Sequence, residues 1–397
     1  MSIGSTRFSR HISVMNTAPS IKPLLSCLVV LLLGYSTGLQ LGRIAPYAVQ
    51  LGDTHGFSLS TIGWLTSLVT VFVALFAIPA ARVINSFDLV RAIKAGAVMM
   101  ALGAALFSFA DSLPGMIAAR VVEAAGHVIT VIAAPSYLAV KAPDILRRVF
   151  LALWSSFLPV GFALSNGISG FISQGSDMQS IWFIYAIAMV VVTTLVLVIL
   201  TDENRPPTQS SNTAAPPKVA WVLVVSFGIY AFLSIAFFTF LPTYTVVSSA
   251  QMISATIVPL FVPLGSFMAA FLFARTDAGL PPKVISLGFL VIGTVALFCF
   301  PSLTSDGSLF RAAFAFGCGM TAAAIFTSVP VIAHTEGSSA RTIGAIAQAG
   351  GAMVLLGAPM AGFILETDGW QMIEYSFAIA AFCAASWALV ALRKAKV

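Results

Sequence analysis

Charged side chains are scarce in this sequence. Asp, Glu, Lys and Arg make up only 9% of the 397 residues, whereas hydrophobic residues make up 59%. A water-soluble domain of this length could not cover its surface with so few charges. Because a membrane-spanning helix needs about 20 consecutive apolar residues, the composition indicates a chain that lies almost entirely within a membrane.

Other missing features exclude further classes of protein. The four cysteines lie in apolar runs at unrelated spacings, so neither a disulfide framework nor a zinc site is indicated. The sequence has no Gly-x-x-x-x-Gly-Lys-Ser/Thr phosphate loop, which argues against nucleotide-driven transport. Its cations are dispersed and do not form a basic stripe with interleaved aromatic residues, so we expect no nucleic-acid partner. No cofactor is indicated.

Long apolar runs recur along the chain and predict twelve transmembrane helices. Because the runs are continuous and do not alternate with polar residues, they favour helices over barrel strands. The expected fold class is therefore an all-α polytopic membrane protein. The spans are expected at residues 23–50, 58–81, 89–110, 114–140, 149–173, 180–200, 219–243, 250–274, 283–302, 308–333, 341–365 and 369–391.

Lysine and arginine are distributed unevenly between the two sides of these spans. Three of the 20 lie away from this pattern, inside spans or at their opposite ends, and the other seventeen lie before the first span, after the last, or in and beside every second connection. The intervening loops carry only acids, namely Asp53, Asp111, Asp177, Asp306, Glu366 and Asp368. This asymmetry predicts a protein of the inner membrane with both termini in the cytoplasm, where the net charge of +6 lies beside anionic lipid.

A polar, Pro-rich segment divides the predicted spans into six and six. A weak internal repeat supports this division, because Arg120 and Arg311 are each followed six residues later by glycine, at the same ordinal span of each half. We therefore expect two pseudo-symmetric six-helix bundles. The expected parts are a cytoplasmic tail at residues 1–21, bundles at 22–200 and 219–397, and a flexible linker at 201–218.

Three short motifs accompany this plan. The loop after the second span reads Ala81-Arg-Val-Ile-Asn85-Ser86-Phe-Asp88, with Arg91 and Gly96 beyond it. The fourth span carries Arg120-Val-Val-Glu123-Ala124, and the eleventh carries Gly357-Ala-Pro359-Met-Ala-Gly362. Together with the central linker, these motifs resemble the major facilitator superfamily (MFS) over essentially the whole chain from about Lys22.

This resemblance implies a mechanism as well as a fold. Transporters of this kind carry two parallel bundles around a midplane cavity and work by rocking alternating access. The resemblance also implies that Asn85, Asp88 and Arg91 form a cytoplasmic gate. The loop departs from the family pattern, Gly-x-x-x-Asp-Arg-x-Gly-Arg, because Ala81, Asn85 and Asp88 replace its first Gly, its Asp and its second Gly.

Three ionisable residues share one face of the fourth span. Arg120, Glu123 and His127 are spaced i, i+3 and i+7. Counted from Pro114, Glu123 lies about 14 Å into the membrane, near its midplane. An acid between a fixed cation and an imidazole suits a proton relay. The alternatives are a structural pair of Arg120 and Glu123, with His127 bonded to a carbonyl, or direct contact with substrate.

The remaining polar residues within spans are also candidates. Arg43 lies between Gly42 and Pro46, which both weaken the first span; its guanidinium suits an anion clamp, with snorkelling to the headgroups as an equal alternative. Arg311 lies near the start of the tenth span, where snorkelling or pairing with Asp306 is favoured over substrate contact. Further candidate substrate contacts are Tyr47, Trp154, Tyr230 and Gln348.

These observations favour a secondary active transporter over an enzyme. Two cations available to a central cavity favour a small organic or inorganic anion as substrate, with protons as the coupling ion. The rival hypothesis is a proton-driven exporter of hydrophobic compounds, favoured by 31 phenylalanines. A membrane-embedded enzyme is a remote alternative, because the loops carry no cluster of acids, bases and nucleophiles. We expect a monomer surrounded by lipid.

Overall fold

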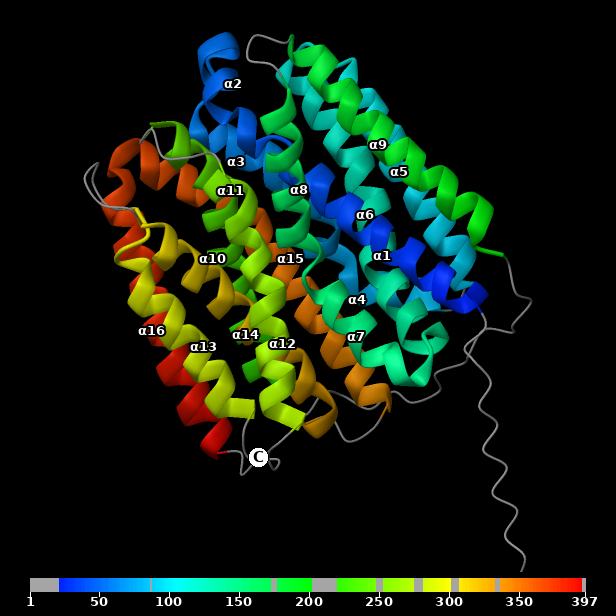
Figure 1. The fold of residues 1–397 in the computed structure, drawn as a ribbon, viewed down its shortest axis with the longest axis vertical. Coiled ribbons are helices and arrows are strands. Elements are labelled where there is room, and N and C mark those ends of the chain that lie inside the picture. The colour runs from blue at the N-terminus through cyan, green and yellow to red at the C-terminus, as the bar shows by residue number, and fades with distance from the viewer. Residues whose placement is uncertain are drawn as a thin grey trace, which may run out of the picture.

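The computed structural model describes residues 21–85, 88–172, 177–201, 220–247, 253–274, 281–300, 307–332 and 336–394. This part of the chain is helical and contains no strand (Figure 1). The helices of the first half are α1 (Ile21–Gly42), α2 (Ala48–His55), α3 (Leu59–Ser67), α4 (Val71–Asn85), α5 (Leu89–Ser108), α6 (Leu113–Lys141), α7 (Asp144–Ser155), α8 (Phe157–Phe171) and α9 (Met178–Ile199). Those of the second half are α10 (Ala220–Val247), α11 (Ile253–Ile257), α12 (Phe261–Ala274), α13 (Pro281–Ala296), α14 (Ser308–Ile332), α15 (Glu336–Thr367) and α16 (Gly369–Lys394).

The number of membrane-spanning segments is close to the twelve predicted. Ten helical segments of the described chain are long and apolar enough to cross a membrane, and the bent pair α7–α8 makes an eleventh. A shorter apolar segment, Lys283–Ala296, occupies the position of the ninth predicted span. The tail expected at 1–21 and the linker expected at 201–218 lie outside the described part, except for their border residues Ile21 and Thr201.

Two of the expected spans are broken where the sequence weakens the helix. The first ends as a regular helix at Gly42 and continues through a 3₁₀ turn, Ala45–Tyr47, in which Pro46 occupies an early position. Proline is tolerated at such a position because its missing N–H has no partner there in any case. The fifth span bends by 60° at Ser156, between α7 and α8. Arg43 lies in the break that follows Gly42.

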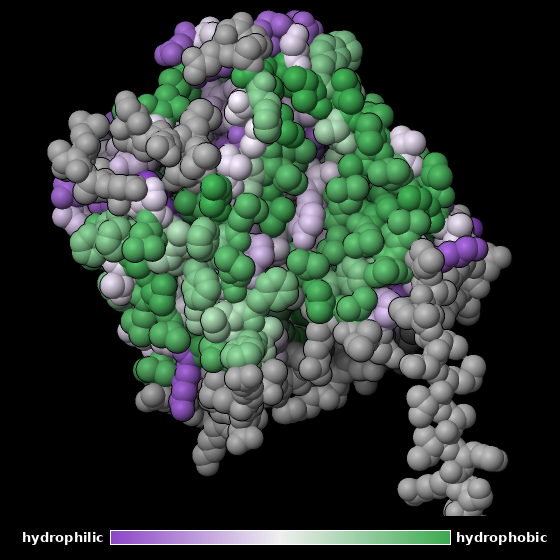
Figure 2. Space-filling model, in the orientation of Figure 1, coloured by the Kyte–Doolittle hydropathy of each residue, from purple (hydrophilic) through white to green (hydrophobic). Residues whose placement is uncertain are grey.

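The two ends of the molecule differ in charge. We call the end where α4 meets α5 and α6 meets α7 the basic end, because Arg91, Lys94, Lys141 and Arg147 lie there. The opposite, acidic end carries Asp53, Asp111, Asp177, Glu366 and Asp368. Between the two ends the outer surface is apolar: Leu102, Val198 and Phe363 are 53%, 73% and 59% exposed. Figure 2 shows hydrophobic side chains over most of the visible face, as expected for contact with lipid.

The internal repeat predicted from the sequence corresponds to a repeated packing unit. Gly126 on α6 and Gly317 on α14 each face a glycine of the preceding span at close range. A Cβ on Gly126 would lie 2.6 Å from the facing carbonyl oxygen, and one on Gly317 would lie 3.2 Å from it. Thr130 and Thr321 donate to the carbonyls of these glycines at 2.9 Å. The facing glycines are Gly96 on α5 and Gly288 on α13.

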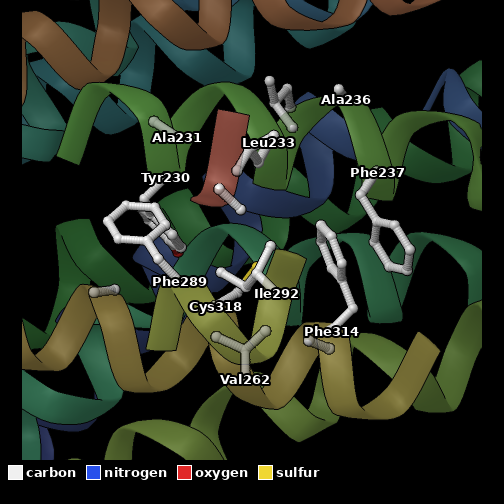
Figure 3. Packing of buried hydrophobic residues seen from close by; sticks show 14 of the residues in the cluster. Tyr230, Ala231, Leu233, Ala236, Phe237, Val262, Phe289, Ile292, Phe314 and Cys318 are labelled. Atoms are coloured by element: carbon white, nitrogen blue, oxygen red, sulfur yellow. The ribbon is translucent and has the colours of Figure 1, made fainter. Parts of the chain in front are cut away.

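The largest hydrophobic cluster lies in the second half and extends across its border. Phe237 on α10 stacks on Phe314 of α14, with ring centroids 4.2 Å apart (Figure 3). Leu41, Ala45 and Phe162 of the first half belong to the same cluster. The two halves therefore share apolar packing near the break in the first span.

Candidate functional site

A cluster of three charged residues lies inside the first half. Arg43 Nη1 and Glu123 Oε1 are 2.8 Å apart, and Arg120 Nη1 lies 2.8 Å from Glu123 Oε2. All three side chains are at most 1% exposed. Arg120 and Glu123 meet because residues three apart on a helix are neighbours, whereas Arg43 arrives from the break that follows α1. Arg120 and Glu123 thus form the ion pair that the sequence left open as the alternative to a proton relay.

Polar groups at the end of α1 hold the two guanidiniums. Arg120 Nη1 donates to the carbonyl oxygen of Gln40 at 2.8 Å, a group left without a helical donor because α1 ends two residues later. The Gln40 side chain accepts a hydrogen bond from Arg43, and its Nε2 donates to the Tyr185 carbonyl at 2.7 Å. The Phe107 ring lies 4.0 Å from Arg43 Cζ and 5.1 Å from Arg120 Cζ. Both cations thus also gain a cation–π contact.

The cluster nevertheless remains short of hydrogen-bond acceptors. Nε and Nη2 of both Arg43 and Arg120 are buried and have no hydrogen-bond partner within the described chain. One carboxylate faces two guanidiniums, so the cluster carries a net positive charge in a region where charge is costly. Unpaired buried donors of this kind call for a bound group or a function.

His127 lies further along the same face of α6, towards the basic end. It is 3% exposed, and its Nδ1 has no hydrogen-bond partner in the described part. It lines a cavity of about 140 Å³ between the two halves, to which α6, α7 and α8 contribute one wall and α10 and α15 the other. Trp154 and Tyr230 line the same cavity, together with Ser234.

Comparison with known proteins decides the family. The sequence model of the Major Facilitator Superfamily matches residues 24–353, most of the chain. The chain belongs to the major facilitator superfamily. A solved structure of a bacterial homolog of the human lysosomal transporter Spinster, in an inward-facing and unoccupied conformation, matches with a TM-score of 0.70 and 14% identity. The match covers 95% of this chain and 98% of that one, and at this identity it shows the fold alone. No curated protein matches the sequence.

The predicted binding residues of this MFS transporter do not form one site. Arg43 and Arg120 gather around Glu123, and none of these three belongs to the cavity lining. Tyr47 instead packs in an aromatic group, with its ring centroid 5.5 Å from that of Trp182 and 6.4 Å from that of Tyr185. The Gln348 side chain on α15 hydrogen-bonds to the backbone of α4.

The predicted gate lies at the basic end of the MFS fold. Asp88 caps α5, and its Oδ1 accepts a hydrogen bond from the backbone N–H of Arg91 at 3.0 Å. Asn85 is the last residue of α4, and its side chain lies outside the described part.

Arg311 does not snorkel. It is 1% exposed and donates to the Cys299 carbonyl and the Ser308 hydroxyl, both at 2.9 Å. Its expected partner Asp306 lies outside the described residues.

Sequence reasoning missed four residues of this region. Gln40 carries a usable signal, because it lies three residues before Arg43 and therefore near it on the helix. Phe107 and Tyr185 carry none, since an aromatic residue in a span is ordinary packing by default. Ser234 follows Tyr230 at i+4, which places both on one face of α10. No group of His, Cys, Asp and Glu that could hold a metal ion occurs in the described chain.

Proposed function

We propose that this MFS transporter is a proton-coupled secondary transporter that carries a small amphipathic organic solute across the inner membrane by alternating access. The cavity between the halves supports this proposal most directly. Aromatic residues, among them Trp154, Phe227 and Tyr230, surround a few polar atoms, and no lysine, arginine, aspartate or glutamate is among its lining residues. Mostly apolar walls with a few placed polar groups are the usual form of a small-molecule site.

The unsatisfied polar atoms of the cavity lie on opposite walls. His127 on α6 has an Nδ1 without a hydrogen-bond partner in the described chain. Ser234 on α10 lies near Tyr230, and its Oγ likewise has no hydrogen-bond partner among the described residues. A solute that bonds to both residues would contact both halves of the protein at once. Such a solute would favour the state in which the halves lie close together, as coupling of binding to conformational change requires.

His127 is the residue we assign to proton coupling at the cavity. Imidazole is the side chain whose ordinary titration falls near physiological pH, and this one lies on the cavity wall. Glu123 and Arg120 lie behind it on the same helix face and fix the charge of that region. In this proposal the carboxylate offsets one of the two guanidinium charges, and His127 exchanges the proton with solute or water.

The test uses purified protein in liposomes with a trapped pH indicator. Aromatic and aliphatic amphipathic solutes, selected by thermal shift, are expected to move protons with wild-type protein. His127→Asn keeps a similar shape and a hydrogen-bonding group, so it should still bind the solute while losing the proton signal. Proton movement at the wild-type rate in His127→Asn would remove the histidine from the mechanism. If no solute of this class moves protons in the wild type, the proposal fails as a whole.

The cluster itself favours a second candidate, a transporter of small anions. Four guanidinium nitrogens, Nε and Nη2 of Arg43 and Arg120, have no hydrogen-bond partner in the part of the chain that the structure describes. Paired donors of this kind suit a carboxylate or an inorganic oxyanion. Arg43→Gln separates the two candidates. An anion transporter should lose uptake of its substrate, whereas transport of an amphipathic solute through the cavity should change little.

We further propose the orientation and the state of assembly. The basic end faces the cytoplasm, because the lysine and arginine residues outside the spans cluster on that side. The protein acts as a monomer, with both termini in the cytoplasm. Residues 22–200 and 219–397 form the two moving bundles. The orientation can be tested by protease digestion of sealed inside-out vesicles. Cleavage at the acidic end, with the basic end protected, would show that the orientation is inverted.

A further inference from the structure

A second hollow lies on the outside of the first half, away from the candidate site. It has a volume of about 560 Å³ and is formed by the last turns of α4, the first turns of α5 and the middle of α6. It shares no lining residue with the cavity that contains His127. The solute site therefore does not account for it.

Small side chains create this groove. Ala80 on α4 and Ala92 and Ala95 on α5 line it, and their short side chains leave space that longer aliphatic residues would fill. Phe76 and Val83 form its outer rim and are 49% and 56% exposed. Since the apolar outer surface of a membrane-spanning protein faces lipid, the groove opens sideways into the bilayer.

The described lining of the groove includes a cation. Among the lining residues whose side chains the structure describes, Arg91 is the one charged residue, and it lies in the first turn of α5 at the basic end. Lys94 follows on the same helix and adds a second positive charge nearby. An apolar slot with a cation at its membrane-surface end complements a molecule with an apolar chain and an anionic head. In a bilayer, that description fits an anionic phospholipid.

We propose that an anionic phospholipid binds in this groove, with an acyl chain between α4 and α5 and its phosphate at Arg91. Arginine binds phosphate through paired N–H donors, so the guanidinium supplies headgroup selectivity while the groove supplies the apolar contact. Pro79 lines the same groove, and the backbone around it is hydrogen-bonded to Gln348 of the second half. The bound lipid therefore contacts α4 at the point where α4 is joined to α15.

The experiment measures retained lipid and does not require a known transport substrate. The full-length protein is reconstituted in nanodiscs of phosphatidylcholine mixed with phosphatidylglycerol, extracted gently and weighed by native mass spectrometry. The wild type is expected to retain phosphatidylglycerol in preference to phosphatidylcholine. Ala95→Leu fills the groove and should abolish the adduct. Arg91→Gln removes one charge and should lower phosphatidylglycerol retention about fivefold. Val98→Leu is the matched control. Val98 lies one turn further along α5, and its side chain is 45% exposed, so this variant should retain lipid.

The outcomes are distinguishable even if a variant folds poorly. A photoreactive phosphatidylglycerol with its diazirine in the acyl chain should label peptides containing Phe76 or Val83 in the wild type, and excess unlabelled phosphatidylglycerol should compete. Equal retention of the two phospholipids, an unchanged adduct in Ala95→Leu, or label distributed evenly over the outer surface would each overturn the proposal. An adduct with the mass of the detergent, in place of a phospholipid, would also overturn it.

Discussion

Gln348 on α15 hydrogen-bonds to the backbone of α4 at its proline. Its Oε1 accepts from the N–H of Ile78 at 3.1 Å, and its Nε2 donates to the carbonyl of Leu75 at 3.4 Å. Pro79 has no N–H to donate to the Leu75 carbonyl, which would be its ordinary helical acceptor. An amide from the second half of the protein thus replaces a hydrogen bond that the first half cannot make.

Loss of this amide should loosen the junction between the halves. Gln348→Leu leaves the Leu75 carbonyl and the Ile78 N–H without a side-chain partner. Because these groups are at most partly buried, the cost is about 0.5–1.5 kcal/mol per hydrogen bond. We expect a lower thermal unfolding midpoint and a broader distance distribution between spin labels on α4 and α15. Gln371→Leu is the control, because Gln371 is exposed and its hydrogen bond within the described chain goes to the Tyr375 hydroxyl of its own helix. Equal effects of both variants would show that the α4 contact contributes nothing specific.

Removal of Glu123 should damage the protein more than removal of Arg43. Glu123→Gln leaves two buried guanidiniums without a counter-ion, and breaking a buried ion pair in this way costs about 3–5 kcal/mol. Arg43→Gln leaves the pair of Arg120 and Glu123 intact and removes the excess positive charge. Unfolding midpoints of the two variants in the same detergent give the comparison. A less stable Arg43→Gln would show that Arg43 contributes mainly through its packing on Phe107.

The repeated glycine contacts predict unequal effects in the two halves. In Gly126→Ala the new Cβ would lie 2.6 Å from the Gly96 carbonyl oxygen, so α5 and α6 must move apart. In Gly317→Ala the closest contacts are 3.0 Å and 3.2 Å, which the flexible Ile292 side chain can relieve in part. Overpacking of this kind typically costs about 1–3 kcal/mol, and Gly126→Ala should lie at the upper end. Gly170→Ala meets no atom within 4 Å and serves as the unperturbed control. Unfolding midpoints that rank Gly317→Ala below Gly126→Ala would contradict the contact geometry.

One helix cap at the acidic end should depend on pH. Hydrogen bonds from the Ser180 hydroxyl and backbone N–H lower the pKa of Asp177 below its ordinary value of 3.8. Because the folded pKa is depressed, the cap's contribution is present above the unfolded pKa and is lost as the pH falls through the folded one. Hydrogen exchange of the Ser180 amide should therefore lose protection only in that acidic range. Asp177→Asn also caps but does not titrate, so its protection should not show this loss.

The sequence predicted the elements of this fold better than their contacts. Apolar runs and the alternation of cations were sufficient for the spans, and helical spacing was sufficient to place Arg120 beside Glu123. For Arg43 the sequence left two environments open, because the decision depends on how α1 packs against α6. Gln348 illustrates the same limit: whether its amide faces the cavity or α4 depends on a proline in another helix.

The order in which the charged residues are made has a consequence for biosynthesis. Arg120 and Glu123 are separated by one helical turn, so the fourth span can enter the bilayer with its charges already paired. Arg43 is synthesised three spans earlier, and an arginine without a counter-ion inside a span costs up to roughly 2.5–3.5 kcal/mol, the value that insertion scales give at the helix centre. We therefore expect Arg43 to remain in a hydrated environment during synthesis until Glu123 has entered the membrane.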